Sequence, residues 1–189
     1  MKDGVKMTKN IEIEFKTIVS KEQYETLLKS FRLEDNVFKQ VNYYFDTDDY
    51  KLNQQQMVLR IRKKSDTYYK VTLKSQSDHG AYENHLLLTK SQAEEMIEKG
   101  FNSKDYFDDI DYYVTFKVSL DNYRVKTPYL DGELFLDRCE YCNTVDYEIE
   151  YEVNNYHEGL KIFENFLKEY GINYQPTKRK SERAFTCKR

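Results

Sequence analysis

Charged side chains recur at every second position in four stretches of this sequence. Acidic residues alternate with apolar ones over residues 11–16 and 147–153, and basic residues do so over residues 59–62 and 69–74. Because successive side chains of a β-strand point to opposite faces, each stretch predicts a strand with one charged and one apolar face. The charged residues are Glu12, Glu14, Lys16, Arg60, Arg62, Lys70, Lys74, Glu148, Glu150 and Glu152.

The two signs of charge are sorted by strand, with acids on the first and last strands and bases on the middle ones. A single charged strand face is typical of a solvated sheet, but a surface built only for solubility mixes the signs. Carboxylates two residues apart lie about 6.8 Å apart along a strand, where they repel by about 2.4 kcal/mol at an effective dielectric of about 20. Bound Mg²⁺ or Mn²⁺ would offset this repulsion, so the acidic strands predict a metal site.

The basic strands predict an anion site. A triphosphate carries about four negative charges, and several Arg and Lys side chains must converge to bind it. A closed sheet of about eight strands brings distant strands together and leaves room inside for one small ligand. Polar residues inside such a barrel, with apolar residues packed outward against helices, would form a tunnel.

Period-two alternation covers most of the remaining chain, and three segments have helical periodicity. We therefore predict an α+β fold: a closed, eight-stranded, mostly antiparallel β-barrel (tunnel) with flanking helices. The expected strands are 11–19, 37–46, 57–64, 67–75, 82–88, 114–125, 132–141 and 147–153, and the expected helices are 20–33, 89–99 and 156–170. Residues 1–9 are expected to form a disordered extension, followed by one domain over residues 10–189.

Composition excludes several classes of protein. The net charge of −3 gives no general attraction to nucleic acid or to a membrane surface, and six glycines leave no glycine-rich phosphate loop. Three cysteines cannot all pair, and neither a signal peptide nor an apolar run of about 20 residues is visible. A cytoplasmic location follows as an expectation. The Tyr-rich outer strand faces would suit either a homodimer contact or packing against the helices.

The order of motifs resembles the CYTH superfamily, also called triphosphate tunnel metalloenzymes. The family's E-x-E-x-K signature is similar to residues 12–16, and its Y-Y-F-D-T motif is similar to residues 43–47, where Asp46 could equally end a strand in a turn. The L-R-I-R strand matches residues 59–62, the T-L-K strand ends at residue 74, and the late acidic strands resemble residues 136–137 and 147–150. The resemblance covers residues 10–185.

This resemblance implies roles for individual residues. Metal ligands are expected at Glu12, Glu14 and Glu150, with Asp137 and Glu148 as second choices. Phosphate contacts are expected from Lys16, Arg60, Arg62, Lys74, Arg124, Lys180 and Arg183, and the catalytic set comprises Glu12, Glu14, Lys16 and Glu150. The C-terminal motif departs from the family pattern, so Lys178 could replace Lys180, and Glu83 falls near an acidic family position. We interpret His79, His85 and His157 as ordinary surface or strand residues.

The function implied is Mg²⁺- or Mn²⁺-dependent hydrolysis of inorganic triphosphate or a triphosphorylated small molecule, such as thiamine triphosphate. A class IV-type adenylate cyclase would share the tunnel and release pyrophosphate from ATP. A non-catalytic polyphosphate- or nucleotide-binding regulator would keep the basic residues but would not need the acidic ones. An interaction module built on a solvated β-sandwich would bind no phosphate specifically.

Overall fold

The computed structural model describes residues 8–77 and 80–187. Its first strand, β1 (Thr8–Val19), begins within the extension expected over residues 1–9. The rest of that extension, residues 1–7, lies outside the described residues, and so does His79.

Nine strands and five α-helices occur in the described parts of the chain. After β1, the strands are β2 (Phe38–Asp46), β3 (Met57–Ser65), β4 (Tyr68–Ser77), β5 (Gly80–Leu88), β6 (Phe101–Asn102), β7 (Tyr113–Tyr129), β8 (Gly132–Tyr141) and β9 (Thr144–Val153). The helices are α1 (Lys21–Ser30), α2 (Lys51–Gln54), α3 (Lys90–Lys99), α4 (Tyr156–Glu169) and α5 (Lys180–Phe185), with 3₁₀ helices at Glu34–Asn36 and Ser103–Asp105.

The strands form one sheet in the order β2-β3-β4-β5-β1-β9-β8-β7-β6, and β2 also pairs with β7. This pairing closes eight strands into an antiparallel β-barrel with β6 as an additional short strand. The predicted fold class is confirmed, and every expected strand is present: β8 has the expected bounds, and the others differ at one or both ends. The largest shift is in β7, whose 17 residues run well beyond the expected range of 114–125.

Helix α1 shows how local sequence sets an element's limits. The Ser20 hydroxyl accepts a hydrogen bond from the Gln23 N–H, and the Gln23 side chain accepts one from the Ser20 N–H, so the predicted capping box forms. The helix ends at Ser30 rather than at Leu33 because Arg32 adopts a left-handed conformation (φ 55°). The Leu33 N–H then reaches back to the Leu28 carbonyl at 2.9 Å, which closes the helix in a Schellman motif.

The other two predicted helices form as expected. Helix α3 begins after Thr89, whose capping box with Gln92 is complete, and it ends at Gly100. Helix α4 begins after Asn155, whose side chain accepts a hydrogen bond from the Glu158 N–H. Gly171, with φ of +63°, follows the end of α4.

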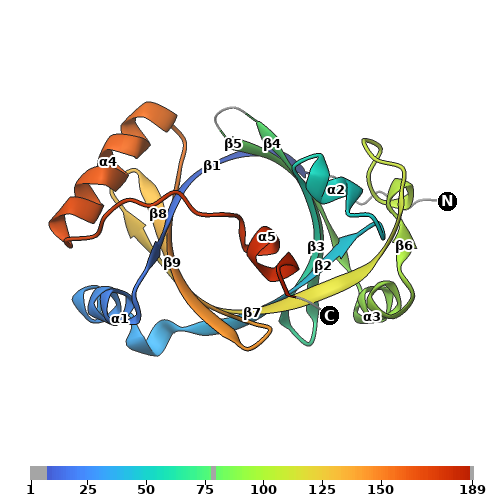
Figure 1. Ribbon diagram of the computed structural model, residues 1–189, viewed down its shortest axis with the longest axis horizontal. Helices are drawn as coiled ribbons and strands as arrows, with labels where there is room; N and C mark the ends of the chain where they lie inside the picture. The colour runs from blue at the N-terminus through green and yellow to red at the C-terminus, as the bar shows by residue number, and fades with distance from the viewer. Residues whose placement is uncertain (1–7, 78–79, 188–189) are drawn as a thin grey trace. The chain divides into compact units, whose positions relative to one another are not determined.

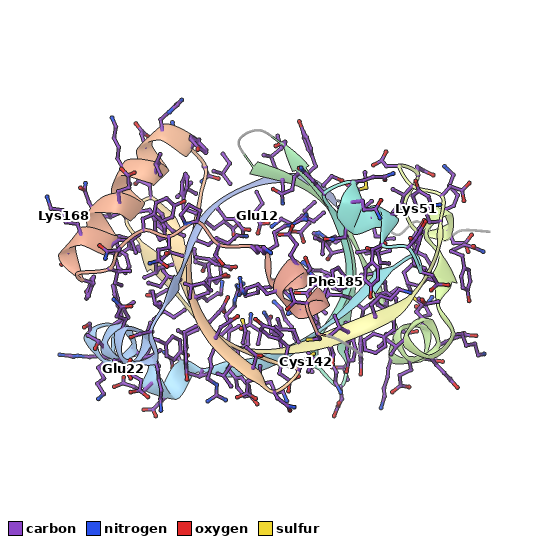
Figure 2. All side chains as sticks on the ribbon, viewed as in Figure 1. Glu12, Glu22, Lys51, Cys142, Lys168 and Phe185 are labelled. Atoms are coloured by element: carbon purple, nitrogen blue, oxygen red, sulfur yellow. The ribbon has the colours of Figure 1, made fainter. Side chains whose placement is uncertain are left out.

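Two short helices and one short strand lie outside the predicted elements. Helices α2 and α5 have four and six residues, too few to show a helical hydrophobic period. Packing of aromatic rings holds α5, because the Phe185 ring lies 6.0 Å from the ring of Tyr44 and 5.4 Å from that of Tyr50. Figure 2 labels Phe185 on this helix.

The described chain divides into two compact units. The first contains residues 8–11, 40–77, 80–120 and 180–187, and the second contains residues 12–39 and 121–179.

In the second unit, one face of the sheet forms an apolar core with two helices. The core contains Phe15 of β1, Leu27 of α1, Tyr151 of β9 and Phe163 of α4. Figure 1 shows α1 and α4 beside β9 and β8. Exposed charged residues cover the helices, including Glu22 on α1 and Lys168 on α4, both labelled in Figure 2. The opposite face of these strands is therefore left for the polar residues.

The first unit has a core of the same design. Leu59 and Ile61 of β3 and Val71 and Leu73 of β4 pack with Ala93 of α3. All five are buried. The basic residues that alternate with these strand positions thus lie on the other face, as the period-two pattern predicts.

Candidate functional site

The polar face of the second unit gathers charged residues from four strands. Antiparallel pairing places Lys16 of β1 opposite Glu150 of β9, and Glu148 of β9 opposite Asp137 of β8. Asp137 in turn lies opposite Arg124 of β7. Directly opposed residues share a face, so these five side chains lie on the side opposite α1 and α4.

Three carboxylates form the centre of this face, and we call Asp137, Glu148 and Glu150 the acidic cluster. One carboxylate oxygen from each lies within 4.8 Å of the others. Asp137 and Glu148 are fully buried, and Glu150 is 8% exposed. Burying like charges this close is costly unless a cation compensates, and oxygen ligands of this kind suit Mg²⁺ or Mn²⁺. The donor set therefore fits the predicted metal.

Arg124 binds two members of the acidic cluster. Its Nε and Nη2 donate to the two oxygens of Asp137 at 2.7 and 2.6 Å, and Nη2 also donates to Glu150. The guanidinium carbon lies 4.4 Å from the centre of the Phe135 ring. Burial lowers the pKa of Arg124, but the charges of Asp137 and Glu150 outweigh it and hold the pKa well above its usual value. Arg124 thus neutralises part of the acidic cluster. The sequence did not predict this pairing with carboxylates.

Lys16 provides a second cation on this face. Its Nζ donates to Glu14 Oε1 at 2.8 Å, and both side chains are less than one fifth exposed, at 19% and 18%. Burial lowers the pKa of Lys16, but the charges of Glu14, Glu150 and Glu148 raise it above its usual value. Lys16 therefore stays charged at neutral pH. Glu12, half-buried, follows the same alternation along β1.

The first unit carries a group of opposite charge. We call Arg60, Arg62, Lys70 and Lys74 the basic cluster. Pairing of β3 with β4 sets Arg60 opposite Thr72 and Arg62 opposite Lys70, so these residues share a face. Arg62 is 8% exposed, and its Nε donates to the Asn42 side chain at 2.8 Å.

Glu83 supplies a carboxylate to the basic cluster. Its Oε1 lies 3.6 Å from Lys70 Nζ and 3.9 Å from Arg60 Nη2. Burial raises the pKa of Glu83, but Arg60, Lys74 and Lys70 together hold it below its usual value. Burial lowers the pKa of Lys70, and the charges of Arg60 and Arg62 lower it further. The charge of Glu83 raises it, but the pKa stays below its ordinary value. The four cations gathered around Glu83 make this group a candidate site for an anion.

The residues expected at the C-terminus divide between the two units. Lys180 and Arg183 lie on α5 in the first unit, and Lys180 is only 8% exposed. Lys178, the alternative, is exposed and belongs to the second unit.

Several site residues were not predicted from the sequence. Alternation placed Lys70 on the basic face, but no role was assigned to it, and Thr72 and His85 were not expected in the site. Thr72 is opposite both Arg60 and His85, so the three residues form one row across β3, β4 and β5. His157, by contrast, is an exposed surface residue on α4, as expected.

Asp46 accepts hydrogen bonds from the backbone at the end of β2. It accepts hydrogen bonds from the N–H groups of Thr47, Leu52 and Asn53 at 2.8, 2.9 and 3.0 Å. These bonds tie the end of β2 to α2, so Asp46 ends a strand in a turn, one of the two readings left open by the sequence. Burial raises its pKa, although the three backbone donors oppose the shift.

The Cys139-x-x-Cys142 motif does not act as a pair. Cys139 is buried outside any disulfide, with its thiol 3.9 Å from Asn122 Oδ1, whereas Cys142 takes part in a disulfide bond.

None of the helices in the described parts of the chain combines the length and the apolar character needed to cross a membrane.

The fold and its two charged groups define an antiparallel β-barrel domain with buried carboxylates on some strands and clustered bases on others. The model of the CYTH domain family matches residues 10–185, and the chain belongs to this family.

Two relatives match nearly the whole chain at about one third identity. A Bacillus subtilis (strain 168) protein named "Putative triphosphatase YjbK" is 34% identical over 191 residues, covering 97% of this chain and 98% of the relative. The crystal structure of a "putative adenylate cyclase" from Bacillus halodurans has a TM-score of 0.85 at 33% identity, covering 94% of this chain and 98% of its own.

A more distant structure shares the fold. HpAC1 from Hippeastrum, described as a "putative adenylyl cyclase" with a dominant triphosphatase activity, has a TM-score of 0.73 at 23% identity. The likeness covers 93% of this chain and 94% of that protein.

Proposed function

We propose that this protein is a divalent-metal-dependent triphosphatase that hydrolyses inorganic triphosphate or a small triphosphorylated compound. The observation that carries the proposal is the acidic cluster. Binding an anion would not require three buried carboxylates with oxygens within 4.8 Å of one another, whereas holding a metal ion would. The relative named "Putative triphosphatase YjbK", 34% identical over 98% of its length, supports the same activity.

The acidic cluster would hold Mg²⁺ or Mn²⁺, with Glu12 and Glu14 as the further ligands expected from the family signature. The bound metal would supply charge neutralisation at the phosphate oxygens and a site for water. Arg124 keeps the carboxylates of Asp137 and Glu150 oriented through its paired hydrogen bonds. We assign no general base.

The basic cluster would bind the phosphate chain. Arg60 and Arg62 offer forked N–H donors suited to phosphate oxygens, and Lys70 and Lys74 add point charges. Lys16 and Arg124, expected to contact phosphate, are paired with carboxylates in the second unit. In the proposed reaction Lys16, held in its charged form by Glu14, contributes a positive charge beside the acidic cluster.

Two substitutions test the assignment. Glu14→Ala should lower kcat/KM for the preferred triphosphate at least about tenfold, and Arg60→Ala about 100-fold, with an unchanged far-UV CD spectrum. Glu25→Ala on the exposed side of α1 and Lys63→Ala on the opposite face of β3 are the matched controls. Near-normal turnover in both test variants would remove the assignment, and cyclic AMP formed from ATP would identify a cyclase instead.

The cytoplasmic location and the homodimer remain predictions. Size-exclusion chromatography with light scattering would decide the oligomeric state.

A further inference from the structure

Glu83 holds an unusual place in the basic cluster. It is 8% exposed. Among the paired residues of β3, β4 and β5 that contain the basic cluster, Glu83 is the one carboxylate beside four cations. Its distances of 3.6 Å to Lys70 and 3.9 Å to Arg60 exceed those of an ordinary N–H···O hydrogen bond. The carboxylate is therefore shared loosely between cations and is not locked to one partner.

Lys70 reaches Glu83 from a distance. Pairing of β4 with β5 sets Lys70 opposite Leu87, and Glu83 lies opposite Lys74. Four residues separate the two rows, which corresponds to about 13 Å along a strand. The Lys70 side chain must therefore extend along the sheet to bring its Nζ within 3.6 Å of Glu83. A half-buried lysine that extends along the sheet toward one carboxylate indicates that Glu83 attracts the cationic end of Lys70.

Polar atoms between these residues lack partners. In the described chain, Arg60 Nε, Thr72 Oγ1 and His85 Nδ1 are buried and make no hydrogen bond. The three residues form one row, between the row of Lys70 and the row of Glu83. A buried polar atom without a partner costs about 1–3 kcal/mol. This row therefore has donors to offer to a ligand with many acceptor oxygens, and a single carboxylate does not satisfy them.

We propose that Glu83 is a resident counter-ion that competes with the phosphate chain for Lys70 and Arg60. An entering phosphate group replaces the Glu83 carboxylate as the partner of both cations, and Glu83 recovers them when the phosphate leaves. Glu83 thus limits the affinity for polyphosphates and promotes release of product. This inference rests on the proposed function, because it takes the basic cluster as the phosphate-binding group.

A purely structural role for Glu83 makes the opposite prediction. If Glu83 only positions Lys70 and Arg60, removing its charge should scatter the cations and weaken anion binding. If it competes, removing its charge should strengthen binding. The sign of the change separates the two roles.

The test is isothermal titration calorimetry of the full chain with tripolyphosphate and with pyrophosphate, in the presence of a metal chelator. Glu83→Gln should bind both ligands on the order of tenfold more tightly than the wild type. Lys70→Met should bind them more weakly, and Glu83→Gln should gain less in a Lys70→Met background because one contested cation is gone. Glu94→Gln on the exposed side of α3 is the control for loss of a negative charge.

Turnover with Mg²⁺ provides a second measurement. Glu83→Gln should be inhibited more strongly by pyrophosphate and should have a lower kcat, because product leaves more slowly. Unchanged or weaker anion binding by a folded Glu83→Gln variant would overturn the inference. If that variant fails to fold, Glu83→Asp replaces it, because aspartate keeps the charge on a shorter side chain. Weaker anion binding by Glu83→Asp would then show that Glu83 positions the cations and does not compete for them. If the wild type binds tripolyphosphate but does not hydrolyse it, and Glu83→Gln binds more tightly, the counter-ion role stands and the triphosphatase proposal fails.

Discussion

Arg124 should contribute to stability mainly by compensating the acidic cluster. Two unit charges 4.8 Å apart, the limit for oxygens of Asp137, Glu148 and Glu150, repel by about 3.5 kcal/mol at an effective dielectric of about 20. Arg124→Met leaves these buried charges without their hydrogen-bonded cation. Protonation and relaxation cap the loss, and breaking a buried pair typically costs about 3–5 kcal/mol. For a chain of this size, that loss lowers the Tm by about 6–20 °C.

Differential scanning calorimetry in chelator, and then with excess Mg²⁺, measures this effect. A bound divalent cation should restore part of the lost Tm in Arg124→Met, and should stabilise this variant more than the wild type. The control is Arg138→Met, which removes an ion pair to Glu140. Both side chains of this pair are 37% exposed, so the pair contributes less than about 1 kcal/mol to stability. If Arg124→Met melts within about 2 °C of Arg138→Met, with or without metal, the acidic cluster does not have the electrostatic character described here.

Three further outcomes follow from local geometry. Gly159→Ala should destabilise the packing of α4 by about 1–3 kcal/mol in urea denaturation, because the new Cβ would lie 2.5 Å from Val153 Cγ2. Asp46→Asn keeps the size of the side chain but replaces one of its two acceptor oxygens by an NH2 donor, so at least one of the three backbone N–H groups loses its partner and the free energy of unfolding should fall by about 1–2 kcal/mol. Burial raises the pKa of Tyr24 from 10.0 to about 12, so the stability that depends on a neutral Tyr24 hydroxyl is complete below pH 10 and is lost as the pH rises to about 12. Between these pH values, the free energy of unfolding of Tyr24→Phe should fall less than that of the wild type, as measured by urea denaturation at each pH.

The period-two pattern was sufficient to predict the strands and the faces of the charged residues. Glu14, Arg60 and Glu150 each lie on the polar side of a strand whose other side packs in a core, because one face of each strand is apolar in sequence. Capping boxes at Ser20 and Thr89 fixed the starts of two helices for a similarly local reason.

The pairing of Arg124 with Asp137 depends on strand register, which the pattern does not supply. The hairpin that joins β7 to β8 sets Tyr129 opposite Gly132, and this register places Arg124 opposite Asp137. A shift of one residue would move Arg124 to the other face. The contact between Lys70 and Glu83 could not be predicted either, because alternation gives the face on which a side chain lies but not the direction in which it extends.

The short elements could not be predicted for a different reason. Helix α2 depends on hydrogen bonds to Asp46, and α5 depends on contacts between Phe185 and the rings of Tyr44 and Tyr50. The first is a hydrogen bond across a turn and the second is a long-range contact, and four or six residues contain too little periodicity to reveal either helix.

The most direct test of metal-dependent hydrolysis is the release of phosphate from tripolyphosphate by the wild type, with Mg²⁺ or Mn²⁺ and with chelator. We expect rapid release with metal, none with chelator, and a loss of at least about tenfold in Glu150→Gln. Release that is unaffected by chelator, or no release from tripolyphosphate, ATP or thiamine triphosphate with either metal, would contradict the proposed function.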